Sequence, residues 1–420
     1  MRCRACCRGT VVRPWARLQR KLPASTRCRV LLTKRCASTM RCSTMPADIP
    51  ALNIVQVNRH SPGGGGSEQA FHLAVALQRR GHRVLFITAP DERWRKRCDT
   101  VGMPVAFLPM HGRFNLAMAA KLAALIKQHR THVVHAHKGR EQALMFWASF
   151  FSRIPALVAN RGVSFPVGRL RALKYRFRTD AVVAVSESIR RELLASGVPA
   201  SKVVTIYGGV DIQRFHPSVD GDGVREEFRI PHDALLIVKV AHVREWKGYE
   251  VFLPAAAAVA RAEPRAFFLC AGKGTGESPD LDALSRNLGL EHRLRWAGFR
   301  EDLPQTLAAA DICVHAATAG EGVTGVVREA LAMAKPVVVT DVGGNRELVL
   351  DHETGLLVPP RDPDALAQGM LALMRAPAQA AALGRAGRRL VEQRFSHEVK
   401  AERVERLYLD ILHRKGFLST

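Results

Sequence analysis

The stretch "NIVQVNRHSPGGGGSEQAFHLAVALQRRGHRVLFIT" (residues 53–88) predicts the fold of this chain. A short β-branched run at 53–58 leads into consecutive glycines, and 68–80 then places apolar residues at helical spacing before stopping at Gly81. A second β-branched run follows at 83–88. A strand, a glycine loop, a helix and a strand in this order form a unit whose two strands lie parallel in one sheet.

The same alternation continues along the chain. Further short runs are "VAFLPM", "HVVHAH", "ALVAN", "AVVAVS" and "KVVTIY", and after residue 228 they are "LLIVKVAHV", "RAFFLCAG", "RLRWAG", "DICVHAA", "PVVVTD" and "GLLVPP". Continuous apolar strands joined by helices indicate a parallel sheet covered on both faces. The polar stretch "SVDGDGVREEF" (218–228) between the two series has the composition of a linker. We therefore predict an α/β protein with two doubly wound, Rossmann-like domains that face each other across a cleft.

The length of 420 residues also favours more than one core. We expect an N-terminal domain at 48–215, a C-terminal domain at 216–395, and a final helix within 396–420 that packs back across the domains. Residues 1–47 form a separate N-terminal extension.

Positive charge is concentrated in this extension. Of the net charge of +25, twelve positive charges and no acid lie in residues 1–47, which leaves +13 for the rest. Such an excess attracts phosphate-rich partners such as nucleic acid, anionic membrane or a phosphorylated substrate. Beyond the extension the cysteines are Cys98, Cys270 and Cys313, too few for a disulfide framework, and they favour a reducing, cytoplasmic environment.

The extension itself shows no helical or strand periodicity. It has the Arg-rich, acid-free composition of a transit peptide, or it precedes a true start at Met40 or Met45. Its cysteines lack a second ligand pair at zinc-finger spacing. We expect it to be disordered or not native. No secretory signal and no run of eighteen apolar residues occurs, so we expect a protein that does not span a membrane.

In parallel sheets ligands bind at the carboxyl ends of the strands, and three loops there carry candidate residues. The first holds Gly64, Gly65 and Gly66, where backbone can approach a ligand closely, and Ser67 is expected to cap a helix starting at Glu68. The amino end of that helix favours an anion. A flexible surface loop is the alternative, and the dinucleotide-binding fingerprint is absent because the next strand ends in Thr88 rather than an acid.

The second loop lies in "VAHVREWKGYE" (240–250). Arg244 and Lys247 follow a strand and precede Gly248 and a helix. Two cations at a strand end suit a diphosphate, because both offer charge-assisted hydrogen bonds to phosphate oxygens. A solvated basic turn is the alternative.

The third loop lies in "AGEGVTGVVREALAMAKP" (319–336), which follows the strand "DICVHAA". Glu321 is expected in the loop, the backbone N–H groups of 323–325 at a helix N-terminus suited to phosphate, and Glu329 on the helix. A carboxylate accepts hydrogen bonds from vicinal hydroxyls, as in a sugar or a ribose. The alternative is a loop acid followed by an acid that complements the helix dipole.

The last stretch resembles the E-x7-E signature of retaining, nucleotide-sugar-dependent glycosyltransferases of family four, which have the GT-B fold. Five further segments are similar to family elements in the family's order: "GGGSE", "VAVSESIRRELLASGVPASKVVTIYGGVD", "VREWKG", "WAGFREDLPQTLAAADICVHAA" and the segment "PVVVTDVGGNRELV" that extends the signature. The resemblance spans roughly residues 53–395.

The resemblance implies a role for each matching residue. Arg244, Lys247 and Gly248 would hold the donor diphosphate, with backbone amides of Gly322, Val323, Thr324 and Gly325. Glu329 would bind the ribose, and Glu321 would contact the transferred sugar. Gly64, Gly65 and Gly66 would form the loop on the acceptor side.

The chain also departs from the family pattern at three positions. Gly208 stands where the family often has Asn, and His242 where it often has Arg. Gly162 stands where some members have a histidine that touches the donor sugar, and His137 and Arg161 are the candidates for that work.

The function implied is transfer of a hexose-type sugar from a UDP-, GDP- or ADP-sugar to a glycan or glycolipid, as in lipopolysaccharide or envelope synthesis. It would proceed with retention, without a metal or another cofactor, because Arg244, Lys247 and the helix N-terminus at 323–325 would neutralise the departing diphosphate. A GT-B sugar-nucleotide epimerase and, from the charge alone, a nucleic-acid-binding protein are the alternatives. No recognised nucleic-acid motif supports the latter.

The basic segment "GRLRALKYRFR" (168–178) in the N-terminal domain suggests an anionic acceptor. Leu170, Leu173 and Phe177 would face the core or a membrane, while the cations meet lipid phosphates. A solvated basic helix is the alternative. We expect a cytoplasmic protein that associates with the inner face of the cell membrane.

Overall fold

The structure is a computed structural model that describes residues 49–59, 65–110, 115–162 and 168–418. The predicted extension (1–47) and Gly64 lie outside the described residues. The chain forms two compact units. The first contains residues up to Asn160, Lys174–Val182 and Glu405–Thr420, and the second contains Arg161–Leu173 and Val183–Val404. The predicted domain boundary near residue 215 stays a prediction.

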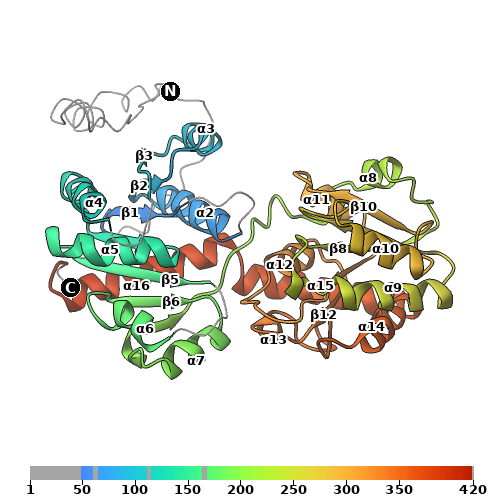
Figure 1. Cartoon of the computed structure of the whole chain (residues 1–420). Coiled ribbons are helices and arrows are strands. Elements are labelled where there is room, and N and C mark those ends of the chain that lie inside the picture. The colour runs from blue at the N-terminus through green and yellow to red at the C-terminus, as the bar shows by residue number, and fades with distance from the viewer. Residues whose placement is uncertain (1–48, 60–64, 111–114, 163–167, 419–420) are drawn as a thin grey trace, which may run out of the picture. The chain divides into compact units, whose positions relative to one another are not determined.

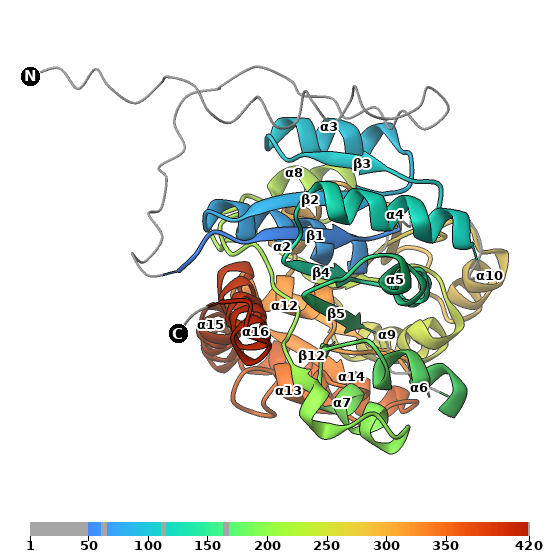
Figure 2. The same ribbon diagram turned by 90° about the vertical axis from the view of Figure 1, so that its left-hand side faces the viewer.

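The first sheet has seven strands in the order β3-β2-β1-β4-β5-β6-β7. They are β1 (Asn53–Val57), β2 (Arg83–Thr88), β3 (Val105–Phe107), β4 (Val133–Ala136), β5 (Ala156–Arg161), β6 (Ala181–Ala184) and β7 (Val203–Thr205). Figure 2 shows β3, β2, β1, β4 and β5 one below another. The order places the carboxyl ends of β1, β4 and β5 next to each other, and the pairs β1–β2, β1–β4 and β4–β5 are parallel. The predicted doubly wound sheet is confirmed.

Helices connect these strands. They are α2 (Gly65–Arg79), α3 (Glu92–Thr100), α4 (Leu116–Gln128), α5 (Gly139–Phe151), α6 (Arg169–Arg176), α7 (Glu187–Ala195) and the short 3-10 helix η2 (Ala200–Lys202). The predicted start of α2 is wrong: the helix begins at Gly65, so Ser67 lies within its first turn. There the Ser67 hydroxyl accepts a hydrogen bond from Lys138 Nζ at 2.7 Å. Glycine carries no side chain that would prevent a helical turn, so the loop contributes two residues to the helix.

The second sheet has six strands in the order β10-β9-β8-β11-β12-β13. The strands are β8 (Leu235–Val240), β9 (Ala266–Ala271), β10 (Leu294–Gly298), β11 (Ile312–His315), β12 (Val337–Thr340) and β13 (Leu356–Val358). The helices are α8 (Asp222–Glu227), η3 (Glu245–Lys247), α9 (Tyr249–Ala262), α10 (Pro279–Asn287), α11 (Leu303–Ala308), α12 (Gly325–Ala332), α13 (Asn345–Leu348), α14 (Pro363–Arg375), α15 (Pro377–Arg394) and α16 (His397–Arg414). The predicted second α/β sheet is therefore confirmed (Figure 1).

Both faces of this sheet are packed, which explains why its strands are continuously apolar. Along β12, Val338 belongs to the core layer that contains Phe252 of α9 and Met370 of α14. Its neighbours Val337 and Val339 belong to the opposite layer, which contains Leu331 of α12. Successive side chains of a strand point to opposite faces, so a strand covered on both sides needs apolar residues at every position.

The polar stretch at 218–228 is not a linker. Residues 222–227 form α8, and Val224 is 3% exposed in the second core. Arg225 donates to the Asp311 carboxylate at 2.7 Å and to the Ala309 carbonyl at 3.0 Å. Arg225 thus ties this segment to the second sheet, while the acids of α8, Asp222, Glu226 and Glu227, are exposed.

The final helix, α16, crosses from the second unit to the first, where it lies among the blue and green elements in Figure 1. In the first unit, the buried Tyr408 hydroxyl accepts a hydrogen bond from Gln56 Nε2 at 3.2 Å and lies 2.6 Å from His135 Nδ1. Glu405 forms an ion pair with Arg80, and its Oε1 lies 2.7 Å from His82 Nε2. The last turns of the chain thus complete the first core with polar contacts.

Candidate functional site

Two loops at the carboxyl ends of neighbouring strands β8 and β11 lie in contact in the second unit. The Thr318 N–H donates to the Trp246 carbonyl at 2.9 Å. Gly248 has φ +62°, and a Cβ there would lie 1.8 Å from the Ala316 carbonyl oxygen. Only glycine allows this approach, because it tolerates positive φ and has no side chain. Gly248 therefore lets the turn that carries Lys247 pack against the loop that carries Glu321.

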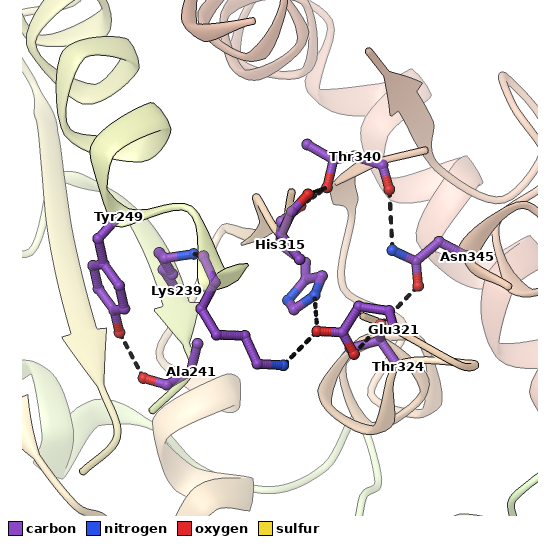
Figure 3. Close-up of polar contacts among 10 residues, drawn as sticks. Lys239, Ala241, Tyr249, His315, Glu321, Thr324, Thr340 and Asn345 are labelled. Atoms are coloured by element: carbon purple, nitrogen blue, oxygen red, sulfur yellow. Dashed lines mark hydrogen bonds and ion pairs between the residues drawn. The ribbon is translucent and has the colours of Figure 1, made fainter. Parts of the chain in front are cut away.

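Lys247 and Glu321, which the sequence analysis assigned to diphosphate and to sugar, form an ion pair with each other. Their side chains are 21% and 11% exposed, so water screens the pair only weakly. His315 Nε2, at the end of β11, lies 3.4 Å from Glu321 Oε1 (Figure 3). The carboxylate thus faces one ammonium and one imidazole.

These neighbours set the protonation of the carboxylate. Burial alone would raise the pKa of Glu321, but the nearby His315 and the Lys247 ammonium lower the pKa to about 2. Burial also lowers the pKa of His315 below its usual 6.5, although Glu321 opposes this shift. At neutral pH we therefore expect an ionised Glu321 and a neutral His315.

The amino end of α12 lies directly after Glu321. Thr324 is the N-cap but makes no capping bond with its side chain, and its hydroxyl donates to Asn345 Oδ1 at 2.7 Å (Figure 3). Asn345 Nδ2 in turn donates to the Thr340 carbonyl at 3.0 Å. The first N–H groups of a helix have no acceptor within the helix, so these amides can receive an anion.

A second glycine loop packs against the backbone of Glu321 and Gly322. Gly343 has φ +59°, and a Cβ on it would lie 2.0 Å from the Glu321 carbonyl oxygen. The Gly344 N–H donates to the Gly322 carbonyl at 2.8 Å. Sequence reasoning gave these residues no role, although the Gly-Gly-Asn run at a strand end was the signal that could have indicated one.

Arg244 and Glu329 flank this centre. Arg244 is exposed as the N-cap of η3, its Nη1 donates to the Val243 carbonyl at 3.1 Å, and it makes no ion pair with a described residue. Glu329 is half-buried on α12, eight positions after Glu321. The structure thus brings Lys247, Glu321 and the start of α12 together, with Arg244 and Glu329 on the adjoining elements.

The departures at Gly208 and His242 have structural explanations. A Cβ at Gly208 would lie 3.0 Å from Nη1 and Nη2 of Arg328, a guanidinium that is almost fully buried and donates to the Val323 carbonyl at 3.0 Å. A side chain at 208 would require this guanidinium to shift. His242 Nδ1 accepts the Lys273 N–H at 3.0 Å, so this ring supports the loop that follows β9.

Predicted residues of the first sheet lie at the carboxyl ends of β1, β4 and β5. Gly65 and Gly66 open α2 and are exposed, and Arg161 is the last residue of β5. His137, which follows β4, is buried, its Nε2 lies 2.5 Å from Gln56 Oε1, and its ring stacks on His135 at 4.4 Å. His137 is therefore held tightly by its own sheet.

An acid that the sequence reasoning missed lies beside the glycine segment. Glu141, in the first turn of α5, is 1% exposed and accepts the Arg59 N–H at Oε1, while its Oε2 has no partner among the described residues. Burial raises the pKa of Glu141. Lys138 Nζ donates to the Arg59 carbonyl at 2.9 Å. In the sequence, Glu141 gave only a weak signal, that of an acid in the first turn of the helix after "HAHK".

Two structural absences concern metals and membranes. Within the described ranges, no group of three or more His, Cys, Asp or Glu side chains is placed to hold a metal ion. In the same part of the chain no helix combines the length and apolar character that a membrane crossing requires.

Comparison with known proteins identifies the family. Residues 63–214 match the sequence family described as Glycosyltransferase Family 4, and residues 234–376 match the family described as Glycosyl transferases group 1. Together the two matches cover most of both units. The chain belongs to the family-four glycosyltransferases.

Curated relatives of this glycosyltransferase differ in how much of their length they share. It is 26% identical to the lipopolysaccharide core biosynthesis glycosyltransferase LpsE of Rhizobium meliloti, over 85% of this chain and 98% of that protein. It is 33% identical to the D-inositol 3-phosphate glycosyltransferase of Kineococcus radiotolerans, over 54% of this chain. That second match spans only 57% of the relative's length.

Solved structures show the same GT-B fold. A glycosyltransferase from Rickettsia africae matches with a TM-score of 0.79 and 22% identity, over 87% of this chain and 99% of that chain. The Anabaena protein Alr3699/HepE, in complex with UDP and glucose, matches with a TM-score of 0.75 and 21% identity, over 85% and 99%. The predicted family and fold class are confirmed.

Proposed function

We propose that this glycosyltransferase moves a hexose-type sugar from a nucleoside-diphosphate sugar to a glycan or glycolipid, with retention of configuration. The observation that carries the donor assignment is the Lys247–Glu321 pair beside the amino end of α12. One ammonium, one carboxylate and free helix amides are the groups that a diphosphate next to a sugar requires. HepE of the same fold was solved with UDP and glucose, and the relative LpsE is named for lipopolysaccharide core synthesis.

In this proposal the Lys247–Glu321 pair rearranges when the donor binds. Lys247, Arg244 and the α12 amides take the diphosphate, and Glu321 is left to accept hydrogen bonds from sugar hydroxyls. Glu329 accepts the ribose hydroxyls. The diphosphate replaces the carboxylate as the partner of Lys247, so the buried ammonium stays paired in both states.

The reaction then needs little beyond positioning and charge stabilisation. The bond between the anomeric carbon and the donor phosphate oxygen breaks, and the acceptor oxygen bonds to the same face of that carbon. The acceptor hydroxyl proton passes to the departing diphosphate oxygen. Lys247, Arg244 and the α12 amides stabilise the negative charge of the diphosphate, which is why we propose a reaction independent of metal.

The acceptor side is proposed from the first sheet. Gly65 and Gly66, at the start of α2, would face the acceptor. His137 after β4 and Arg161 at the end of β5 are the candidates for contact with the donor sugar. Leu173 and Phe177 are 39% and 57% exposed within the basic segment 168–178, which supports an anionic glycolipid at the cytoplasmic membrane surface.

The donor assignment is tested by thermal-shift measurements with UDP-, GDP- and ADP-sugars on the wild type and on Glu329→Ala. We expect one nucleotide series to stabilise the wild type and to lose that effect in the variant. If the nucleotide stabilises Glu329→Ala as much as the wild type, Glu329 does not bind the ribose. The anomeric configuration of the product, read by NMR before it equilibrates, tests retention.

A further inference from the structure

Lys239 has no part in the site described above, although it lies directly beneath it. It belongs to β8, a central strand of the second sheet, and its side chain is completely buried. Burying an ammonium costs free energy unless a partner compensates for the lost water. A lysine in the middle of an otherwise apolar strand therefore needs an explanation.

The contacts of Lys239 all lead to the turn that presents Lys247. Nζ donates a hydrogen bond to the Lys247 carbonyl oxygen at 2.7 Å. It also lies 4.7 Å from the ring centre of Tyr249 and 5.6 Å from that of Phe252, both on the helix that follows the turn. Tyr249 is itself fixed, because its hydroxyl donates to the Ala241 carbonyl at 2.6 Å (Figure 3).

We propose that Lys239 is a positioning residue for the donor diphosphate, fixing the Lys247 turn and adding a buried positive charge behind it. This inference rests on the proposed donor site. The hydrogen bond to the Lys247 carbonyl holds η3 in place, and the ammonium stabilises the anion that binds on the outer side of the turn. Lys239 does not touch the donor.

A buried ammonium behind an anion site also couples binding to protonation. Burial lowers the pKa of Lys239 to about 8, and the groups that further influence it are Cys270 of β9, Lys247 of η3, Glu250 of α9 and Glu321 before α12. A bound diphosphate adds negative charge nearby and raises this pKa. Near pH 8 the protein should therefore take up a fraction of a proton when a nucleoside diphosphate binds.

The test measures UDP and GDP binding by calorimetry near pH 8 in two buffers that differ in ionisation enthalpy. At this pH the terminal phosphate has already lost its proton, since its pKa lies near 6. For the wild type we expect proton uptake with whichever nucleotide binds. Lys239→Met should abolish the uptake and weaken binding by about tenfold, the equivalent of one pKa unit of coupling.

Lys335→Met is the matched control. Lys335 is also a largely buried lysine of the second unit, and its Nζ donates to the carbonyls of Ala308 and Ala310 at 2.6 and 2.8 Å. Its replacement should reduce stability in the same way but leave nucleotide affinity and proton uptake unchanged. Lys239→Arg, which stays charged, should keep affinity better than Lys239→Met and show no proton uptake.

Equal affinity and equal proton uptake in the wild type and Lys239→Met would overturn the inference while leaving the donor site intact. Absence of nucleotide binding by the wild type would instead overturn the donor site and the inference with it. If Lys239→Met does not fold, the wild type alone still tests the inference. Its affinity for the nucleotide must fall as pH rises through about 8. A nucleotide affinity that does not change with pH would contradict the proposed role of Lys239.

Discussion

At the scale of single residues, two glycines have similar backbone conformations but different surroundings. Comparing them distinguishes the cost of a left-handed backbone from the cost of a steric contact at the missing Cβ. Gly248 has φ +62° and its missing Cβ would lie 1.8 Å from the Ala316 carbonyl oxygen, whereas Gly289 has φ +70° and open space around it. Alanine at either position pays the cost of left-handed backbone, about 1 kcal/mol. Only at 248 does it also meet backbone atoms.

We therefore expect Gly248→Ala to lower the free energy of unfolding by more than about 3 kcal/mol and to abolish donor binding, because the turn must move. Gly289→Ala should cost about 1 kcal/mol and leave donor binding unchanged. Chemical denaturation and nucleotide titration measure the two effects. Equal losses in the two variants would show that the contact with Ala316 is unimportant.

The lowered pKa of Glu321 predicts that the free energy of unfolding depends on pH. Its pKa in the folded protein is about 2, below the 4.5 of an ordinary glutamate, so the unfolded chain binds its proton first. The stabilisation is complete above pH 4.5 and is lost as pH falls towards 2. At pH 6 we expect the free energy of unfolding of the wild type to exceed that of Glu321→Gln by on the order of 2 kcal/mol. This difference should shrink by pH 3.

Urea unfolding of both proteins between pH 6 and pH 3 gives this difference. Glu245→Gln, which changes an exposed acid of the neighbouring turn, is the control and should follow the wild type at every pH. A difference between the wild type and Glu321→Gln that does not vary with pH would contradict the assigned ion pair.

At the scale of elements, α16 joins two strands of the first sheet through one hydroxyl. Tyr408 is fully buried and serves both Gln56 of β1 and His135 of β4. Removing the hydroxyl leaves two buried polar groups without this partner, which costs about 1–3 kcal/mol. The sequence indicated a final helix but not this contact.

We expect Tyr408→Phe to lower protection from amide hydrogen exchange in β1 and β4 while β8 and β11 keep theirs. Tyr249→Phe is the matched control, since it removes a buried hydroxyl that donates to the Ala241 carbonyl in the second unit. It should leave exchange in β1 and β4 unchanged. Unaltered exchange in Tyr408→Phe would mean that the helix is held by its apolar contacts alone.

The elements themselves were largely predictable, and the errors have local causes. Periodicity located strands such as 53–57 and 337–340 because both faces of each sheet demand apolar residues. It misplaced the start of α2, because glycines preceding a cap residue can join a helix. It missed α8, because that helix has 6 residues and buries only Val224, which is too little for an apolar periodicity to appear.

At the scale of the whole molecule, the net charge of +25 predicts attraction to anionic surfaces. Arg171, Lys174 and Arg178 lie in the segment that also exposes Leu173 and Phe177. The Arg178 guanidinium lies 4.1 Å from the ring centre of Phe150, a side chain that is 54% exposed. A cation and an exposed apolar ring thus lie side by side here, a combination that suits a membrane interface.

We expect the protein to float with vesicles that contain anionic lipid and not with neutral vesicles, and to lose most of this binding when Arg171, Lys174 and Arg178 become alanine. Removing three exposed arginines elsewhere, Arg261, Arg286 and Arg385, changes the net charge equally and is the control. Equal losses in the two triple variants would assign the binding to overall charge rather than to this segment.

The sequence by itself determined the two α/β sheets, the family, and which residues follow the carboxyl ends of the strands. These properties depend on local periodicity and on short motifs, which a single chain displays directly. It also singled out Lys247, Glu321 and Glu329 as candidates, because the motif fixes their positions, and their roles stay predictions.

Only the tertiary structure decided which of these residues meet. Lys247 pairs with Glu321 because β11 lies beside β8 in the sheet, which brings residues 74 positions apart into contact. The same arrangement places Lys239 under the turn, His315 beside the carboxylate and Gly343 against its backbone. Sheet order and strand register arise from the packing of the whole domain, so no local pattern in the chain could have predicted them.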